Sequence, residues 1–220
     1  MTPLQMMHAM SMLSSDRPKG PVDALFFNAR SFGGDDDGLF ELVHKFMEES
    51  MISAVVVNGG DGRSADDPNK KAWPGTEYYQ GKLYNVFGCQ VIPSRPAVHT
   101  LDEAFAFNEV AKNKGLRSVI TIGQPFHLPC IMLSHLLAMR RQEYSMQVFA
   151  AAPTLVDYTK PTNGNQGAAG VVRFKQIEME YDRIIRYQAQ GNLASTEELL
   201  GYLTGGRMDI LRSSGRLMVA

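Results

Sequence analysis

Residues 117–135, RSVITIGQPFHLPCIMLSH, are the stretch that decides the expected fold. Residues 118–122 form a short apolar run rich in β-branched side chains, which is typical of a buried strand. Gly123 interrupts this run, and apolar residues recur at helical spacing after Pro125. The pattern therefore predicts a strand, a tight turn and a helix start. Free N–H groups and the helix dipole at such a turn favour negatively charged or polar ligands.

The same alternation of apolar runs and amphipathic segments extends in both directions from this stretch. Further strands are expected at residues 22–28, 52–58, 90–93 and 146–151, and helices at residues 38–50, 74–87 and 100–114. Strands that alternate with helices predict an α/β protein with a doubly wound, mainly parallel, five-stranded Rossmann-like sheet. Extra helices are expected at both termini, at residues 2–13, 171–190 and 195–203, with a loop at residues 159–170.

Length and composition fit a single globular domain of 220 residues, of which 44% are hydrophobic. We expect an α/β core at residues 22–152 and a helical extension at residues 171–205. The formal net charge of −1 provides no basic field for nucleic acid, and no apolar stretch nears the roughly 20 residues of a membrane span. The sequence has only two cysteines, Cys89 and Cys130, and no signal peptide is expected. It therefore predicts a cytoplasmic protein, and it leaves the oligomeric state open.

Polar side chains follow the ends of the expected strands. Parallel strands bring their carboxyl ends to one edge of a sheet, and ligands bind outside that edge where the strand order reverses. The following residues are therefore expected to converge there: Asn28, Arg30, Asn58, Gly59, Gly60, Asp61, Ser94, Arg95, Gln124 and His127. This convergence predicts a ligand-binding site.

The glycine-rich turn at residues 59–62, GGDG, has two interpretations. Glycine has no Cβ, so the backbone could approach a phosphate or carboxylate closely, or the segment could be a plain tight turn. The glycines do not have the spacing of the dinucleotide-binding fingerprint, and the sequence has no phosphate-binding P-loop. The usual dinucleotide and nucleoside-triphosphate sites are therefore not expected.

Glu77 and His127 are the candidate catalytic residues. Glu77 lies in the first turn of its expected helix, where it could act as a general base or bind a hydroxyl or amine, or simply compensate the helix dipole. His127 lies at a helix start, where the positive dipole end favours a neutral imidazole that could act as a base or hydrogen-bond donor. The alternative for His127 is a purely structural histidine.

The remaining candidates are arginines, acidic residues and a cysteine. Arg30 and Arg95 could bind an anion through bidentate hydrogen bonds, or they could be solvated at the surface or pair with the acidic run at residues 35–37. For these three aspartates, a solvated helix start is favoured, and a cation site is the alternative. Cys130 is interpreted as buried and inert rather than nucleophilic. No zinc site is expected, because the other histidines lack ligand spacing: His8, His44, His99 and His135.

Taken in order, five segments resemble the YdcF/SanA-like family of α/β domains, whose function is largely unknown. They are a polar loop at residues 28–30, a Gly-Gly turn at residues 58–60, the acidic Glu77 at a helix start, HTLDEA at residues 99–104 and GQPFHLPC at residues 123–130. The resemblance spans roughly residues 22–152. His99, Glu103 and Cys130 depart from it, standing where asparagine, asparagine and arginine are usual.

Members of this family are associated with S-adenosylmethionine binding or with envelope barrier function, and the latter members carry a membrane helix. The resemblance therefore implies S-adenosylmethionine as the candidate cofactor or ligand, and it adds Thr100 and Glu103 to the candidate binding residues. The loss of arginine at position 130 puts a strongly anionic ligand in doubt, although Arg30 or Arg95 could substitute.

Three functions follow as hypotheses. The first is binding of a small nucleoside-like or phosphorylated metabolite, with backbone donors at Gly59 and Gly60 and contacts from Glu77, Gln124 and His127. The second is a hydrolase or transferase that uses Glu77 and His127 as an acid–base pair. The third is a sensor or scaffold that binds a partner through the closing helices or the Met-rich helix at residues 2–13, although that methionine face is expected to pack on its own domain.

Overall fold

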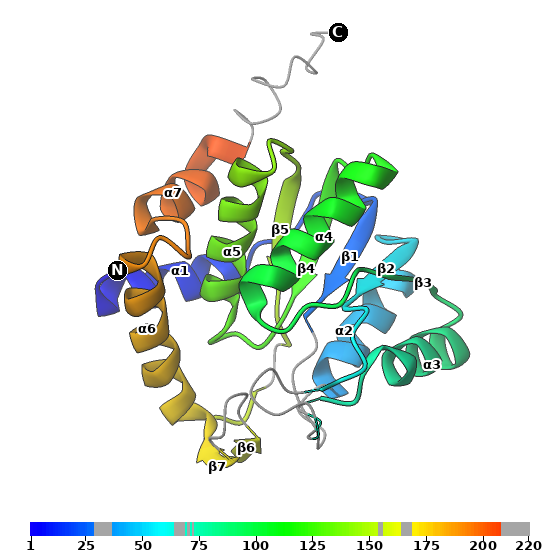
Figure 1. The fold of residues 1–220 in the computed structure, drawn as a ribbon, viewed down its shortest axis with the longest axis horizontal. Coiled ribbons are helices and arrows are strands. Elements are labelled where there is room, and N and C mark those ends of the chain that lie inside the picture. Colours follow the sequence, from blue (N-terminus) through cyan, green and yellow to red (C-terminus); the bar gives the residue numbers. More distant parts are fainter. Residues whose placement is uncertain are drawn as a thin grey trace, which may run out of the picture.

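The computed structural model describes residues 1–28, 37–63, 69, 71, 73–153, 156–163 and 169–207, and it has an all-parallel five-stranded sheet (Figure 1). The strand order is β3-β2-β1-β4-β5, which is the doubly wound, Rossmann-like arrangement expected from the sequence. The strands are β1 (Ala24–Phe27), β2 (Ala54–Val57), β3 (Gln90–Pro93), β4 (Ser118–Ile122) and β5 (Gln147–Ala151). The order reverses between β1 and β4, so the sheet has a switch point there.

The central strands are apolar throughout because helices cover both faces of the sheet. Every residue of β1 and β2 is buried, and successive side chains enter opposite layers. Phe26 packs in a core layer with Val56, whereas the next residue, Phe27, packs in the other layer with Val57. Continuous apolar runs, rather than alternating ones, are therefore the sequence signal of this sheet.

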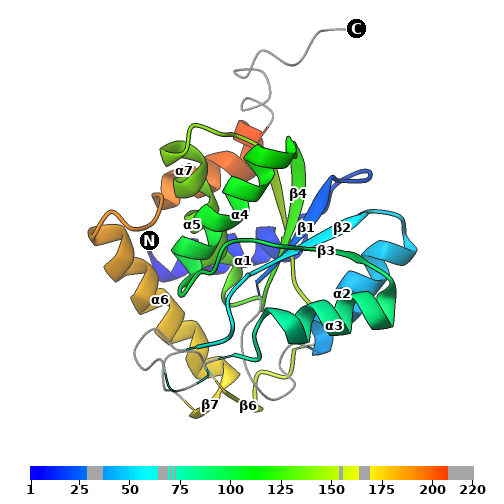
Figure 2. The ribbon, with the colours of Figure 1, turned by 45° about the vertical axis from the view of Figure 1, so that its right-hand side comes forward.

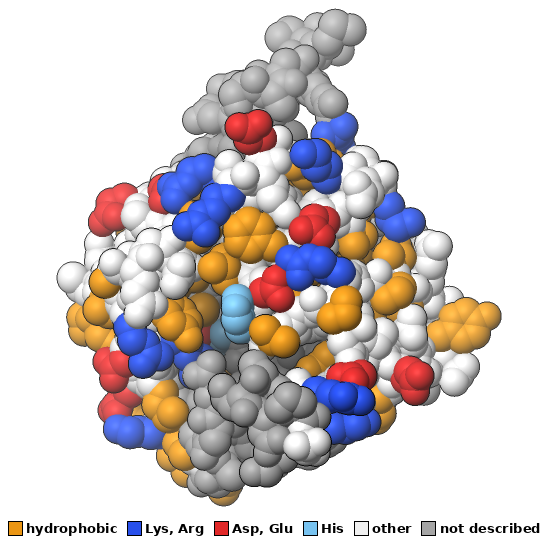
Figure 3. All heavy atoms as spheres, in the orientation of Figure 1, with side chains coloured by type: hydrophobic (Ala, Val, Ile, Leu, Met, Phe, Trp, Pro, Cys, Tyr) orange, Lys and Arg blue, Asp and Glu red, His pale blue; other side chains and the backbone are white. Residues whose placement is uncertain are grey.

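Helices form a layer on each side of the sheet (Figures 1 and 2). The layer on one face contains α2 (Asp37–Glu48) and α3 (Thr76–Phe87). The layer on the other face contains α1 (Pro3–Ser14), α4 (Thr100–Lys114), α5 (Leu128–Arg141), α6 (Arg173–Ala189) and α7 (Thr196–Gly201), which continues into the π-helical turn η1 (Tyr202–Gly206). Acidic and basic side chains are interspersed on the face shown in Figure 3. Among the described residues, no helix has both the length and the apolarity that a membrane crossing requires.

The N-terminal helix α1 packs on its own domain, as expected. Thr2 caps it with Gln5 in a reciprocal capping box. Met6 and Leu13 are buried in the layer that contains α5, whereas Met7 is exposed. The apolar stripe of α1 thus completes the core of the domain.

The segment after β5 differs from the sequence prediction. The expected loop at residues 159–170 contains β6 (Pro161–Asn163), and β7 (Ala169–Val172) occupies the expected start of the next helix. The two short strands pair antiparallel, with Thr162 opposite Val171. The β-branched pair at residues 171–172 suits this hairpin better than a helix start, so α6 begins only at Arg173. Residues 164–168 lie outside the described residues.

His135 is a fully buried histidine in the core. It lies on α5, where its ring stacks on Phe26 at 5.6 Å between centroids and its Nε2 lies 3.3 Å from the hydroxyl of Thr121. Burial lowers the pKa of His135 from the ordinary 6.5 to about 3, because the interior disfavours the charged imidazole.

The neutral state of His135 predicts a pH dependence of stability. Below pH 6.5 the unfolded chain binds a proton at this position, and the folded protein does not until about pH 3. The stability contribution is therefore complete above pH 6.5 and is lost as the pH falls, by about 1.4 kcal/mol per pH unit. Urea denaturation at pH 7, 6 and 5 measures this slope. We expect His135→Leu to flatten it relative to the wild type, and equal slopes would contradict the assignment.

Candidate functional site

His127 lies at the carboxyl edge of the sheet, beside the switch point. It follows β4 and is the N-cap residue of α5. The backbone N–H groups of His127 and Leu128 donate to the carbonyl of Gln124, which closes the turn, and Pro129 suits the first helical turn that follows. The His127 side chain is completely buried. The helix start predicted for this histidine is confirmed.

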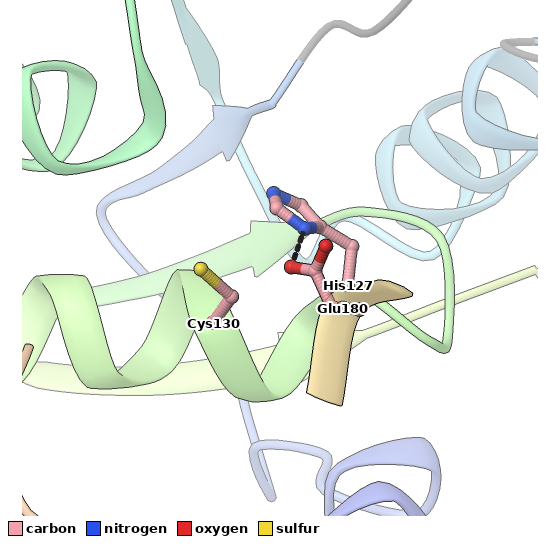
Figure 4. Close-up of side chains that lie close together, drawn as sticks. All are labelled: His127, Cys130 and Glu180. Carbon is pink, nitrogen blue, oxygen red and sulfur yellow. Dashed lines mark hydrogen bonds and ion pairs between the residues drawn. The ribbon is translucent and has the colours of Figure 1, made fainter. Parts of the chain in front are cut away.

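Glu180 is the carboxylate that holds His127. It lies in the middle of α6, 3% exposed, and its Oε1 contacts Nδ1 of the imidazole (Figure 4). Its other oxygen, Oε2, accepts a hydrogen bond from the guanidinium of Arg183, one turn along the same helix. Buried ionisable groups are tolerated when they are paired and hydrogen-bonded. Glu180 therefore links a buried imidazole to a nearly buried guanidinium.

Thr100 contacts the other ring nitrogen of His127. Thr100 is the first residue of α4, which His99 caps by accepting a hydrogen bond from the backbone N–H of Asp102. The Thr100 hydroxyl oxygen lies 3.3 Å from Nε2 of His127, and its side chain is only partly buried. A chain of contacts thus runs inward from a partly buried hydroxyl through an imidazole and a carboxylate to a guanidinium. Three separate parts of the sequence form it.

Cys130 completes this cluster. It lies in the first turn of α5, where an i, i+3 spacing places it near His127. The ligand atoms of His127, Cys130 and Glu180 all lie within 4.8 Å of one another, and all three residues are buried (Figure 4). The burial predicted for Cys130 is confirmed.

The arrangement suits proton transfer. A carboxylate on one nitrogen of an imidazole fixes the ring orientation, and the other nitrogen is then directed at a hydroxyl. An imidazole held in this way can accept or donate a proton at Nε2.

The Asn58–Gly60 turn is held by the neighbouring loops. The Asn58 amide donates to the carbonyl of Ala97 at 2.7 Å and accepts from the backbone N–H of Gly60 at 3.0 Å. Thr76 donates to the carbonyl of Asn58 at 2.6 Å. At Gly59, a Cβ would lie 1.9 Å from the carbonyl oxygen of Ser94, so this glycine is required by close packing of two backbones. The turn is built as a rigid part of the sheet edge.

Other expected ligand residues have partners inside the protein. Asn28 is buried and donates to Thr121 at 2.7 Å, and Asp61 forms an exposed ion pair with Arg63 at 2.8 Å. The Arg95 guanidinium pairs with Asp102 at 2.7 Å and with Glu109 at 3.0 Å. The hydrogen bond from Arg95 to Asp102 raises the pKa of Arg95. Arg95 is thus engaged by two carboxylates of α4, and ligand binding by these residues stays a prediction.

Three further predicted site residues are Gln124, Glu103 and Glu77. Gln124 and Glu103 are buried, at the turn after β4 and in the first turn of α4. Glu77 is exposed in the first turn of α3, in the helix layer on the opposite face of the sheet from α4 and α5 (Figure 2). Its pairing with His127 stays a prediction. Arg30, Asp35 and Asp36 lie outside the described residues, as does the side chain of Asp37.

Sequence reasoning did not identify Glu180 or Arg183. Glu180 follows His127 by 53 residues, in a helix whose position depends on the hairpin before it. One signal was available: Gln176, Glu180 and Ile184 recur at helical spacing on the buried face of α6. A carboxylate on a buried stripe indicates a partner that the sequence alone does not name.

No family model and no curated protein matches this chain. The likeness to the YdcF/SanA-like family therefore stays a resemblance, carried by the segments described above.

Proposed function

We propose that the protein binds a small nucleoside-like or phosphorylated metabolite, with S-adenosylmethionine as the leading candidate, outside the carboxyl ends of β1 and β4. The observation that carries this proposal is the place of His127, at the end of the turn that follows β4, at the switch point of a parallel sheet. Ligands of open α/β sheets bind at this point because the connections on either side diverge there.

The contacts of His127 support a binding role. His127 is buried and contacted at both ring nitrogens, so it fixes the position of Thr100, and a group that is already fixed loses little entropy when a ligand binds. Thr100 is the partly exposed end of the contact chain, so its hydroxyl is the group that we expect to meet ribose hydroxyls or an amino-acid amine. The start of α5 adds a positive dipole end, which favours a carboxylate or phosphate.

Calorimetric titration tests this function. We expect S-adenosylmethionine, or a member of a panel of adenosine nucleotides, to bind with a dissociation constant below about 100 μM, equivalent to about −5.5 kcal/mol. An absence of heat with every member, at protein concentrations near that value, would contradict the proposal. Dithiothreitol in all solutions keeps Cys89 and Cys130 reduced, as both are free cysteines.

Thr100→Val is expected to weaken binding of the same ligand about 5- to 10-fold, because one neutral hydrogen bond contributes about 1 kcal/mol. Valine keeps the shape of the side chain, and His99 rather than Thr100 caps the helix, so folding should be retained. Thr159→Val is the matched control, since Thr159 is an exposed threonine whose hydroxyl donates to the carboxylate of Asp157. Equal affinities for wild type and Thr100→Val would exclude this hydroxyl from the ligand contacts.

A second candidate function is acid–base catalysis in a hydrolase or transferase. It is favoured by the hydroxyl–imidazole–carboxylate chain of Thr100, His127 and Glu180. In this function His127 transfers a proton at Nε2, and Glu180 is a positioning residue that orients the ring and stabilises its charged form. Glu77 stays a candidate for the acid or for ligand binding.

A turnover assay separates the two functions. If bound S-adenosylmethionine is returned unchanged in wild-type incubations, binding alone is supported. If a product forms, we expect His127→Gln to lower kcat about 10²- to 10⁴-fold. Retention of kcat in His127→Gln would contradict acid–base catalysis by this residue.

A further inference from the structure

We propose that His127, Cys130 and Glu180 also form a binding site for a transition-metal dication, with Zn²⁺ as the best match. The three residues offer a nitrogen, a sulfur and an oxygen, all buried and all within 4.8 Å of one another. A tetrahedral zinc site with bonds of 2.0–2.3 Å has its ligand atoms about 3.5 Å apart. The cluster therefore needs only small side-chain movements to close around an ion.

The chemistry of the three donors selects the class of metal. A thiolate and an imidazole are ligands for zinc, cobalt and iron, whereas Mg²⁺ and Ca²⁺ prefer oxygen ligands throughout. Three protein ligands also leave a fourth position of a tetrahedral ion open for water or for a metabolite. This number is typical of catalytic rather than structural zinc sites.

The residues that contact the three proposed ligands are of the kind that hydrogen-bond to metal ligands in other proteins. A metal-bound histidine usually donates its second ring N–H to an oxygen, and a metal-bound carboxylate is usually hydrogen-bonded as well. Thr100 lies 3.3 Å from Nε2 of His127, and Arg183 donates to Oε2 of Glu180. An ion at Nδ1 of His127 would take the place of the direct contact with Oε1 of Glu180. The imidazole proton would then lie on Nε2, and this N–H would donate a hydrogen bond to the Thr100 hydroxyl oxygen.

Metal binding at this site is coupled to the release of a proton. On binding, the Cys130 thiol releases its proton to solvent, because the thiolate is the form that ligates metals. One thiolate and one carboxylate balance the two charges of the ion, and the guanidinium of Arg183 stays as one further positive charge. Metal binding is therefore expected to strengthen as the pH rises.

Titration with Co²⁺, which replaces Zn²⁺ and has a visible spectrum, tests the site directly. After treatment with a chelator, the full-length protein is expected to bind one equivalent of Co²⁺. Binding should produce a thiolate-to-cobalt charge-transfer band, and Zn²⁺ should remove it. Cys130→Ser should lose the band and bind Co²⁺ more than tenfold more weakly. Cys89→Ser is the matched control, because Cys89 is the other buried cysteine and lies outside the cluster.

Thr100→Val gives a second readout that leaves all three ligands in place. Loss of a group behind a metal ligand typically lowers affinity about 10- to 100-fold, and we expect that change for Co²⁺ here. The proposal is overturned if the wild type binds no equivalent of Co²⁺, or if the charge-transfer band persists in Cys130→Ser. It is also overturned if Cys89→Ser loses the band. These results are independent of whether S-adenosylmethionine binds.

Discussion

Replacement of Glu180 by glutamine is expected to lower the free energy of unfolding by about 3–5 kcal/mol. Glutamine has nearly the same shape as glutamate but lacks its charge. The substitution removes the carboxylate charge that pairs with Arg183, which is 11% exposed, and it changes the environment of the fully buried His127. Removal of one member of a buried charged cluster is costly because the remaining charge stays desolvated. Urea denaturation at pH 7 measures the change.

The control is Glu178→Gln, two residues away on the same helix. Glu178 pairs with Lys175 at the surface, and both side chains are more than half exposed. Exposed ion pairs contribute little because water screens them, so this variant should unfold at nearly the wild-type urea concentration. Equal losses of stability in the two variants would show that the buried contacts of Glu180 contribute no more than the exposed ion pair of Glu178.

Gly59→Ala is the second substitution for which we expect a large loss of stability. Its Cβ would lie 1.9 Å from the carbonyl oxygen of Ser94, which belongs to the backbone and has no side-chain freedom with which to move away. Forced separation of the loops after β2 and β3 is expected to cost about 3 kcal/mol. The same displacement would move the Asn58 amide away from Ala97, so ligand affinity should fall as well.

Gly81→Ala is the matched comparison, with an effect of opposite sign. Gly81 lies inside α3, and the nearest atom to an added Cβ is 3.9 Å away. Alanine is preferred over glycine in helix interiors by about 0.5–1 kcal/mol, so this variant should be more stable than the wild type. Thermal denaturation of both variants checks the pair, and a loss at Gly81 or none at Gly59 would contradict the packing described for these loops.

The fold was predictable because its signal is local. Continuous apolar runs such as residues 118–122 mark strands that are buried on both faces, and each run is followed by a break and a helical pattern. The exceptions are β6 and β7. A hairpin of three- and four-residue strands gains its stability from pairing across a turn, and periodicity in so short a segment cannot separate it from a loop or a helix start.

Only the part of the candidate site that the sheet topology determines was predictable from the sequence. His127 follows β4, so its place at the switch point could be inferred from the strand pattern alone. Glu180 and Arg183 reach it from α6, and that approach depends on how the chain returns to the sheet after β5 and the hairpin. For Arg95 the sequence left open an anion, surface solvation or pairing with the aspartates at residues 35–37, and it did not reveal that two carboxylates of α4 pair with the guanidinium.

The central claim is that His127, held by Glu180, is the centre of the ligand site. The most direct test follows the imidazole nitrogens of ¹⁵N-labelled protein by nuclear magnetic resonance while S-adenosylmethionine is added. We expect the His127 ring signals to shift in proportion to bound ligand, and those of His44, which lies exposed on α2, to stay in place. If His127 remains unchanged while the ligand binds, the site lies elsewhere and this account of the protein is wrong.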